Sequence, residues 1–120
     1  MGAGIAQLAC LGRFDTYLHD PVPAALREGE QRLRAALVKG ADRGRWTQAE
    51  AQAASARLRA ASRLEDLAGC ELVIEAAPED LRLKRELFER LAGICGTEAI
   101  LATNTSSLSV TAIASGVERP

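Results

Sequence analysis

Apolar and polar positions along the chain follow two different periods, which predicts a mixture of helices and strands. Four segments carry apolar residues at mostly helical spacing, and three shorter segments carry compact apolar or β-branched runs. The predicted helices are Gly2–Leu11, Pro23–Lys39, Thr47–Ala56 and Asp80–Ile94. The predicted strands are Phe14–His19, Glu71–Ala76 and Ala99–Thr103. Helix and strand alternate, which is typical of the α/β class with a parallel sheet.

Several residue patterns mark where the predicted helices begin and end. Gly12, Gly40 and Gly96 each follow a predicted helix, and glycine is common just after a helix. Thr47–Glu50 has the order of a capping box, in which Thr and Glu satisfy each other's backbone N–H groups. Arg57–Ala61 either continues that helix or forms a short strand, and we favour the strand.

The helix predicted over Asp80–Ile94 has a clear amphipathic pattern. Charged residues of opposite sign stand four positions apart on one side of it. The stripe predicted to face the core consists of Leu83, Leu87, Leu91 and Ile94, widened by Phe88. Lys84 lies outside this stripe, so the pattern alone places it on a solvated helix face.

The composition indicates one globular domain. With 120 residues, 48% of them hydrophobic, the chain can bury a core but has little room for a second domain. A net charge of −1 and an aromatic content of 3% argue against nucleic-acid binding. The start of the chain lacks the basic residues of a signal peptide, and no apolar run approaches the roughly 18 residues of a membrane span. We therefore expect no nucleic-acid or membrane partner and a cytoplasmic location.

Three cysteines and a single histidine limit the chemistry of the chain. Cys10, Cys70 and Cys95 lack metal-ligand spacing, so we interpret them as buried thiols of a reducing compartment and expect no metal site. His19 is the only histidine, and histidine is the usual general base near neutral pH. Acid–base chemistry must therefore use His19 or a group that this sequence does not contain.

One glycine and one aspartate have the spacing of a dinucleotide-binding unit. Gly2 begins a predicted helix, and Asp20 follows a predicted strand 18 positions later. In such units a helix N-terminus faces the pyrophosphate, and an acidic residue about 20 positions on accepts the ribose hydroxyls. The same residues also fit a packed helix and a turn aspartate, so the spacing alone leaves both interpretations open.

Three longer motifs favour the first interpretation. They are MGAGIAQ at residues 1–7, LVIEAAPEDLRLKRELF at residues 72–88 and LATNTSSL at residues 101–108. In this order they closely resemble the NAD-binding domain of the 3-hydroxyacyl-CoA dehydrogenase family, including bacterial 3-hydroxybutyryl-CoA dehydrogenases. The resemblance covers essentially all of residues 1–120. It implies a Rossmann-type α/β fold with a helical hairpin insertion, and NAD as the cofactor.

The resemblance also implies roles for individual residues near the cofactor. Met1 and Gly2 match the end of the family's glycine-rich turn under the pyrophosphate, and Asp20 matches the acid that binds the ribose. A carboxylate there repels a 2′-phosphate, so NAD is expected over NADP. Glu79 and Lys84 match a pair that borders the nicotinamide side of the site. Without the family, the sequence favours a carboxylate at a helix N-terminus for Glu79 and a solvated helix face for Lys84.

Two further positions concern the substrate. Ser106 matches a serine between the nicotinamide and the 3-oxygen of the substrate, where its hydroxyl would stabilise charge on that oxygen. Without the family it is equally a turn or capping serine. Arg43 falls near a lysine that contacts the phosphates of CoA, while Ala36 replaces the family's serine. Arginine also pairs with phosphate, but a plain solvated loop fits this segment as well.

The resemblance further implies parts that this sequence does not show. The family's general base is a histidine in a His-x-x-Asn-Pro context after the position of Pro120, followed by a helical domain that usually forms a homodimer. His19 cannot replace it, because its position corresponds to the adenine ribose. We therefore expect a partial NAD-binding domain over residues 1–120, truncated at both ends, without its first strand and inactive alone. Two alternatives remain: a Rossmann oxidoreductase for another β-hydroxyacid, and a non-catalytic Rossmann-fold binding module.

Overall fold

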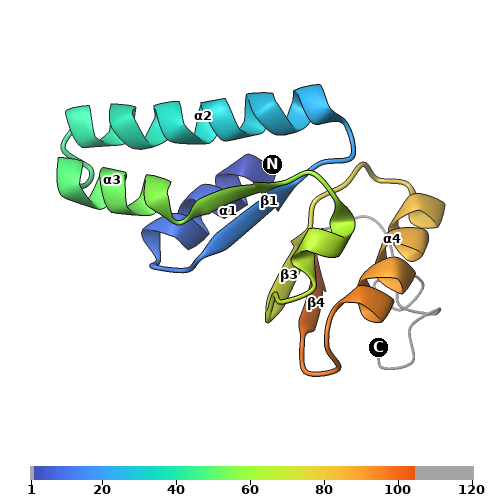
Figure 1. Ribbon diagram of the computed structural model, residues 1–120. Coiled ribbons are helices and arrows are strands. Elements are labelled where there is room, and N and C mark those ends of the chain that lie inside the picture. Colours follow the sequence, from blue (N-terminus) through green and yellow to red (C-terminus); the bar gives the residue numbers. More distant parts are fainter. Residues whose placement is uncertain (1, 105–120) are drawn as a thin grey trace. The chain divides into compact units, whose positions relative to one another are not determined.

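Helices and parallel strands alternate along the computed structural model, which describes residues 2–104 (Figure 1). The chain divides after Arg63 into two units, each of which is described by itself. Each unit contains one pair of parallel strands. No helix within the described range combines the length and the apolar character that crossing a membrane requires. The predicted α/β class is confirmed.

The first unit has the order helix–strand–helix–helix–strand along the chain. Its elements are α1 (Gly2–Leu11), β1 (Thr16–His19), α2 (Pro23–Asp42), α3 (Gln48–Ala56) and β2 (Leu58–Ala61). Strands β1 and β2 are parallel, and Thr16 stands opposite Leu58. Helices α2 and α3 lie side by side and form the expected hairpin (Figure 1). The core consists of Ala6, Cys10, Leu33, Leu37, Ala51, Ala54 and Leu58.

The prediction that Gly40 ends its helix is wrong. Helix α2 continues to Asp42, and Gly40 is buried within it. The indole of Trp46 lies against Gly40, so a side chain at this position would overlap the ring. The indole Nε1 donates a hydrogen bond of 2.8 Å to the carbonyl of Leu37. Gly40 therefore provides the space that Trp46 fills, rather than a helix stop.

The turn after α1 also differs from the prediction in its details. The helix ends at Leu11 as expected, but the residue with positive φ is Arg13, at 72°, and not Gly12. The N–H of Phe14 bonds to the carbonyl of Ala9, and that of Arg13 bonds to the carbonyl of Cys10. These two bonds define a Schellman motif, whose left-handed position is usually a glycine.

The helix α3 begins and ends as the sequence indicates. Thr47 accepts a hydrogen bond from the N–H of Glu50, and the Glu50 carboxylate accepts one from the N–H of Thr47. The predicted capping box is therefore confirmed. The next segment forms strand β2, which confirms the strand that we favoured over a longer helix.

The second unit contains η1 (Leu64–Leu67), a short 3₁₀ helix, followed by β3 (Leu72–Glu75), α4 (Leu81–Ile94) and β4 (Ile100–Thr103). The two strands are parallel, and Glu75 stands opposite Thr103 at their carboxyl ends. Asp80 caps α4 by accepting a hydrogen bond of 3.2 Å from the N–H of Leu83.

The buried face of α4 is rotated from the predicted stripe. Lys84, Phe88 and Leu91 are the buried residues of this helix, whereas Leu83 is 42% exposed. The sequence pattern placed Lys84 in solvent, and this prediction is wrong. The reason is electrostatic, because the ammonium group meets a buried carboxylate on β3.

Candidate functional site

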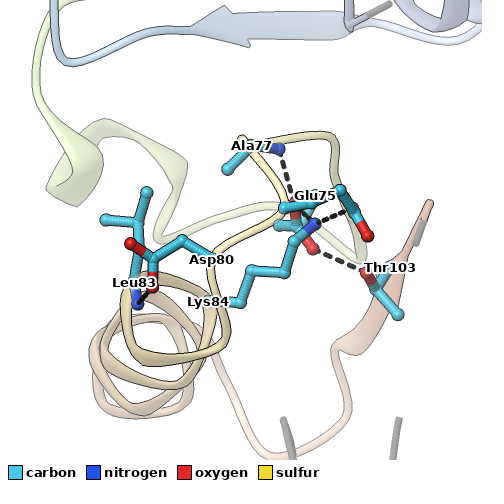
Figure 2. A network of polar contacts seen from close by, with 7 residues as sticks. Glu75, Ala77, Asp80, Leu83, Lys84 and Thr103 are labelled. Atoms are coloured by element: carbon cyan, nitrogen blue, oxygen red, sulfur yellow. Dashed lines mark hydrogen bonds and ion pairs between the residues drawn. The ribbon is translucent and has the colours of Figure 1, made fainter. Parts of the chain in front are cut away.

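A buried carboxylate at the carboxyl end of β3 organises the candidate site (Figure 2). The Glu75 side chain is 0% exposed. Its Oε2 accepts hydrogen bonds from the Ala77 N–H at 2.5 Å and from the Lys84 Nζ at 2.7 Å. Its Oε1 accepts a bond of 2.6 Å from the Thr103 hydroxyl. Groups from β4, from the β3–α4 connection and from α4 therefore meet at one carboxylate.

The Lys84 ammonium lies between two carboxylates. It is 2.7 Å from Glu75 Oε2 and 3.1 Å from Glu79 Oε1. Lys84 stands in the first turn of α4, where side chains lean towards the N-terminus of the helix. This direction brings the long side chain back to the end of β3. The Lys84 side chain is 1% exposed, whereas that of Glu79 is 46% exposed, so the second carboxylate faces solvent.

The protonation of Lys84 follows from these contacts. Burial acts to lower the pKa of Lys84, but hydrogen bonds to Glu75 and Glu79 and their charges oppose this and leave the pKa raised. Lys84 is therefore a fixed cation at neutral pH. It can hold an anionic or polar group in place, but it is not a general base.

The structure brings together one predicted pair of site residues in the second unit. Glu79 and Lys84, which the family resemblance singled out, form an ion pair. Sequence reasoning missed Glu75 and Thr103 as parts of the same network. The available signal was Glu75 itself, because a carboxylate at the end of a buried apolar strand requires a partner. Ser106 lies outside the described residues.

In the first unit, Asp20 follows the carboxyl end of β1 and is half-buried. Its Oδ1 accepts a hydrogen bond of 2.9 Å from the N–H of Val22, which fixes the carboxylate in the turn. Gly2 is the first residue of α1, and Met1 lies outside the described residues. His19 Nδ1 lies 2.8 Å from the Ala61 carbonyl, so a protonated Nδ1 makes a structural contact between neighbouring strands.

A small basic pocket lies beside the end of α2. Its volume is about 130 Å³, and its lining residues are Gln7, Ala36, Lys39, Gly40, Arg43, Arg45 and Trp46. Three of these side chains are cationic, and the indole of Trp46 supplies an apolar wall. Positive charge beside an aromatic ring suits a phosphate that is attached to a ring-containing group. Arg43 lines this pocket, and its side chain is exposed.

Parallel strands, connecting helices and polar side chains at the strands' carboxyl ends are typical of α/β proteins of the Rossmann type. The family model for the NAD-binding domain of 3-hydroxyacyl-CoA dehydrogenases matches residues 1–120. The chain belongs to this family, and its cofactor is NAD.

Similar proteins agree with this assignment. A 3-hydroxybutyryl-CoA dehydrogenase of Bradyrhizobium diazoefficiens is 38% identical over 120 residues, which are 100% of this chain and 41% of that protein. The crystal structure of a 3-hydroxybutyryl-CoA dehydrogenase of Escherichia coli K12 has a TM-score of 0.96 and 38% identity, over 100% of this chain and 25% of that one. A (S)-3-hydroxybutyryl-CoA dehydrogenase of Ralstonia eutropha has a TM-score of 0.92 and 33% identity, over 99% and 42% of the two chains. The chain thus spans less than half of each relative's length.

Proposed function

We propose that this chain is the NAD-binding part of an L-3-hydroxyacyl-CoA dehydrogenase, which transfers hydride reversibly between the 3-hydroxyl carbon of an acyl-CoA and NAD. The observation that carries the proposal is the Lys84 ammonium, which is held between Glu75 and Glu79 at the carboxyl end of β3. Ligands of open parallel sheets bind outside the carboxyl ends of the strands. A fixed cation in that position suits the polar groups of a dinucleotide.

The contacts proposed with NAD involve Met1, Gly2, Asp20, Glu79 and Lys84. Met1 and Gly2 would place the N-terminus of α1 under the pyrophosphate, and Asp20 would accept the hydroxyls of the adenosine ribose. The half-buried Asp20 is already oriented by the Val22 N–H. Glu79 and Lys84 would border the nicotinamide side. These assignments rest on the family resemblance and on the positions of these residues at strand and helix ends.

Substrate contacts would involve Ser106 and Arg43. The Ser106 hydroxyl would stabilise the substrate's 3-oxygen, and NAD, when bound, would accept the hydride. Lys84 cannot take the hydroxyl proton because it stays protonated, so the base belongs to another group. Arg43 would pair with a CoA phosphate in the pocket beside Trp46. For the whole protein we propose an acyl-CoA substrate, in line with the names of its bacterial relatives. We also propose a homodimer, which the family resemblance implies, and a cytoplasmic location.

Cofactor preference tests this proposal. Calorimetric titration of the chain with NADH and NADPH should show tighter binding of NADH, because the Asp20 carboxylate repels a 2′-phosphate. The variant Asp20→Asn should weaken the binding of NADH and reduce the preference for NADH over NADPH. The variant Asp15→Asn, on an exposed loop, should change neither the affinity nor the preference. Equal affinity for both nucleotides in the unmodified chain, or no binding of either, would overturn the proposal.

The CoA assignment has its own test. Trp46 is the only tryptophan and lines the basic pocket, so its fluorescence reports directly on that pocket. Adenosine 3′,5′-bisphosphate should change this signal at lower concentration than adenosine. Arg43→Gln should reduce the difference, whereas Arg32→Gln, on an exposed part of α2, should leave it unchanged. Identical responses to both compounds in the unmodified chain would contradict a phosphate contact.

A further inference from the structure

Glu75 and Glu79 share the Lys84 ammonium but differ in their surroundings. Glu75 is 0% exposed and its two oxygens accept three hydrogen bonds, from Ala77, Lys84 and Thr103. The Glu79 side chain is 46% exposed. Burying a carboxylate is costly unless a close cation and further hydrogen-bond donors compensate for the lost water. Glu75 satisfies this condition, whereas the Glu79 side chain reaches solvent.

We propose that Glu75 is the positioning residue of the site: it holds the Lys84 ammonium at the carboxyl end of β3, and Glu79 is the partner that a bound ligand displaces. Lysine has a flexible four-carbon side chain and three donor hydrogens. One donor is committed to Glu75 through the shorter contact, 2.7 Å against 3.1 Å for Glu79. Glu79 Oε1 lies 3.1 Å from the same ammonium, and the ligand would compete with Glu79 for the remaining donors.

Thr103 and Ala77 donate the other hydrogen bonds that hold the Glu75 carboxylate in place. The Thr103 hydroxyl bonds Oε1, and the Ala77 N–H bonds Oε2 together with Lys84. These neutral donors come from β4 and from the segment after β3, so they fix the plane of the carboxylate from two sides. Since β3 and β4 are paired at Glu75 and Thr103, the orientation of Lys84 is coupled to the register of the sheet.

The positioning role is tested first without any ligand. A buried ammonium that is held by a carboxylate exchanges its hydrogens slowly and gives an observable ¹H–¹⁵N signal. We expect this Lys84 signal in the unmodified chain and in Glu79→Gln, and its loss in Glu75→Gln. Retention of the signal in Glu75→Gln, or its loss only in Glu79→Gln, would overturn the proposal.

Thr103 provides a milder pair of variants if Glu75→Gln does not fold. Thr103→Val removes the donor to Oε1, while Thr103→Ser keeps it. We expect faster exchange of the Lys84 ammonium in the valine variant and unchanged exchange in the serine variant. Equal exchange rates in the two variants would contradict the proposal that Thr103 orients the Glu75 carboxylate.

A second readout rests on the proposed function, namely NAD binding. Glu75→Gln removes the charge-assisted contact with Lys84, which should weaken the binding of NADH about tenfold. Thr103→Ser should retain the affinity for NADH. If the unmodified chain does not bind NADH, the proposed function fails, while the ammonium signal still decides the role of Glu75. Unchanged NADH affinity in a folded Glu75→Gln would contradict the proposal.

Discussion

Lys84 Nζ lies 2.7 Å from Glu75 Oε2, and both side chains are buried in the second unit. Removing one partner leaves an uncompensated charge, so Lys84→Met should lower the free energy of unfolding by about 3–5 kcal/mol. Chemical denaturation followed by circular dichroism measures this loss. The exposed neighbour Arg85 supplies the control, since Arg85→Met should stay within about 0.5 kcal/mol. Equal effects of the two substitutions would show that the buried pair does not stabilise the fold.

The same pair predicts a pH dependence of stability. The pKa of Lys84 in the folded chain is raised above its ordinary value of 10.5, so the folded state binds a proton more tightly than the unfolded state. The stabilisation is therefore fully present below about pH 10.5 and is lost as the pH rises through the higher folded pKa. Lys84→Met should abolish this part of the alkaline decline. A decline of equal size in both proteins would assign it to other groups.

Cys70 should react slowly with alkylating reagents. Burial raises the pKa of the Cys70 thiol above its ordinary value of 9.0, and neighbouring Cys95 acts in the same direction. Because the thiolate is the nucleophile, the pH at which Cys70 reacts half-maximally with iodoacetamide should lie above 9.0. Peptide mass mapping of native and urea-unfolded protein measures this difference. An equal or lower midpoint in the native protein would contradict the burial effect.

Gly40 and Gly93 should respond to alanine in opposite directions, although both lie in helices. A methyl group at Gly40 meets the Trp46 ring, and such overpacking costs about 1–3 kcal/mol. Within residues 2–104, no atom other than those of the adjacent residues and of the helix's own backbone lies within 4 Å of the corresponding position at Gly93, where alanine should stabilise the helix by about 1 kcal/mol. Denaturation curves followed by Trp46 fluorescence and by circular dichroism measure both effects. A stabilising Gly40→Ala would mean that the indole does not occupy this position.

Arg13 should be replaceable by glycine with a gain in stability. Its φ of 72° is left-handed, which costs a residue with a Cβ about 1–2 kcal/mol. Glycine avoids this cost, but it also increases the entropy of the unfolded chain, which opposes folding. Arg13→Gly should therefore raise the free energy of unfolding by up to about 1 kcal/mol. Arg13→Ala keeps the unfavourable backbone and should bring no gain. Thermal denaturation compares the stability of the two variants. A higher stability of Arg13→Ala would show that the charge of Arg13, and not its backbone conformation, is unfavourable.

Local patterns predicted much of the fold because they act over a few residues. The capping box at Thr47 and the strand over Leu58–Ala61 needed no distant partner to be recognised. Gly40 was misinterpreted because its role depends on Trp46, whose ring folds back across a turn. Periodicity describes one helix at a time, and it cannot show which neighbouring side chain comes to occupy a glycine.

The candidate site was predictable only in part, for a similar reason. The spacing of Glu79 and Lys84 within the family motif identified the pair, and their ion pair is present. Glu75 and Thr103 belong to strands whose pairing brings them together from 28 positions apart. The apolar stripe of α4 also misplaced Lys84, because a buried ion pair outweighs the hydrophobic pattern of one helix. Polar contacts between such distant positions can be predicted only when the register of the sheet is known.

Binding of NAD at both predicted regions is tested most directly by NMR titration of the isotopically labelled chain. NAD should shift the signals of Gly2 and Asp20, which would contact the adenosine and pyrophosphate, and also those of Glu79 and Lys84 on the nicotinamide side. Adenosine monophosphate should shift only the Asp20 region. Shifts of Glu79 and Lys84 that appear with NAD and not with the monophosphate would support the account. NAD that leaves Glu79 and Lys84 unchanged would contradict it.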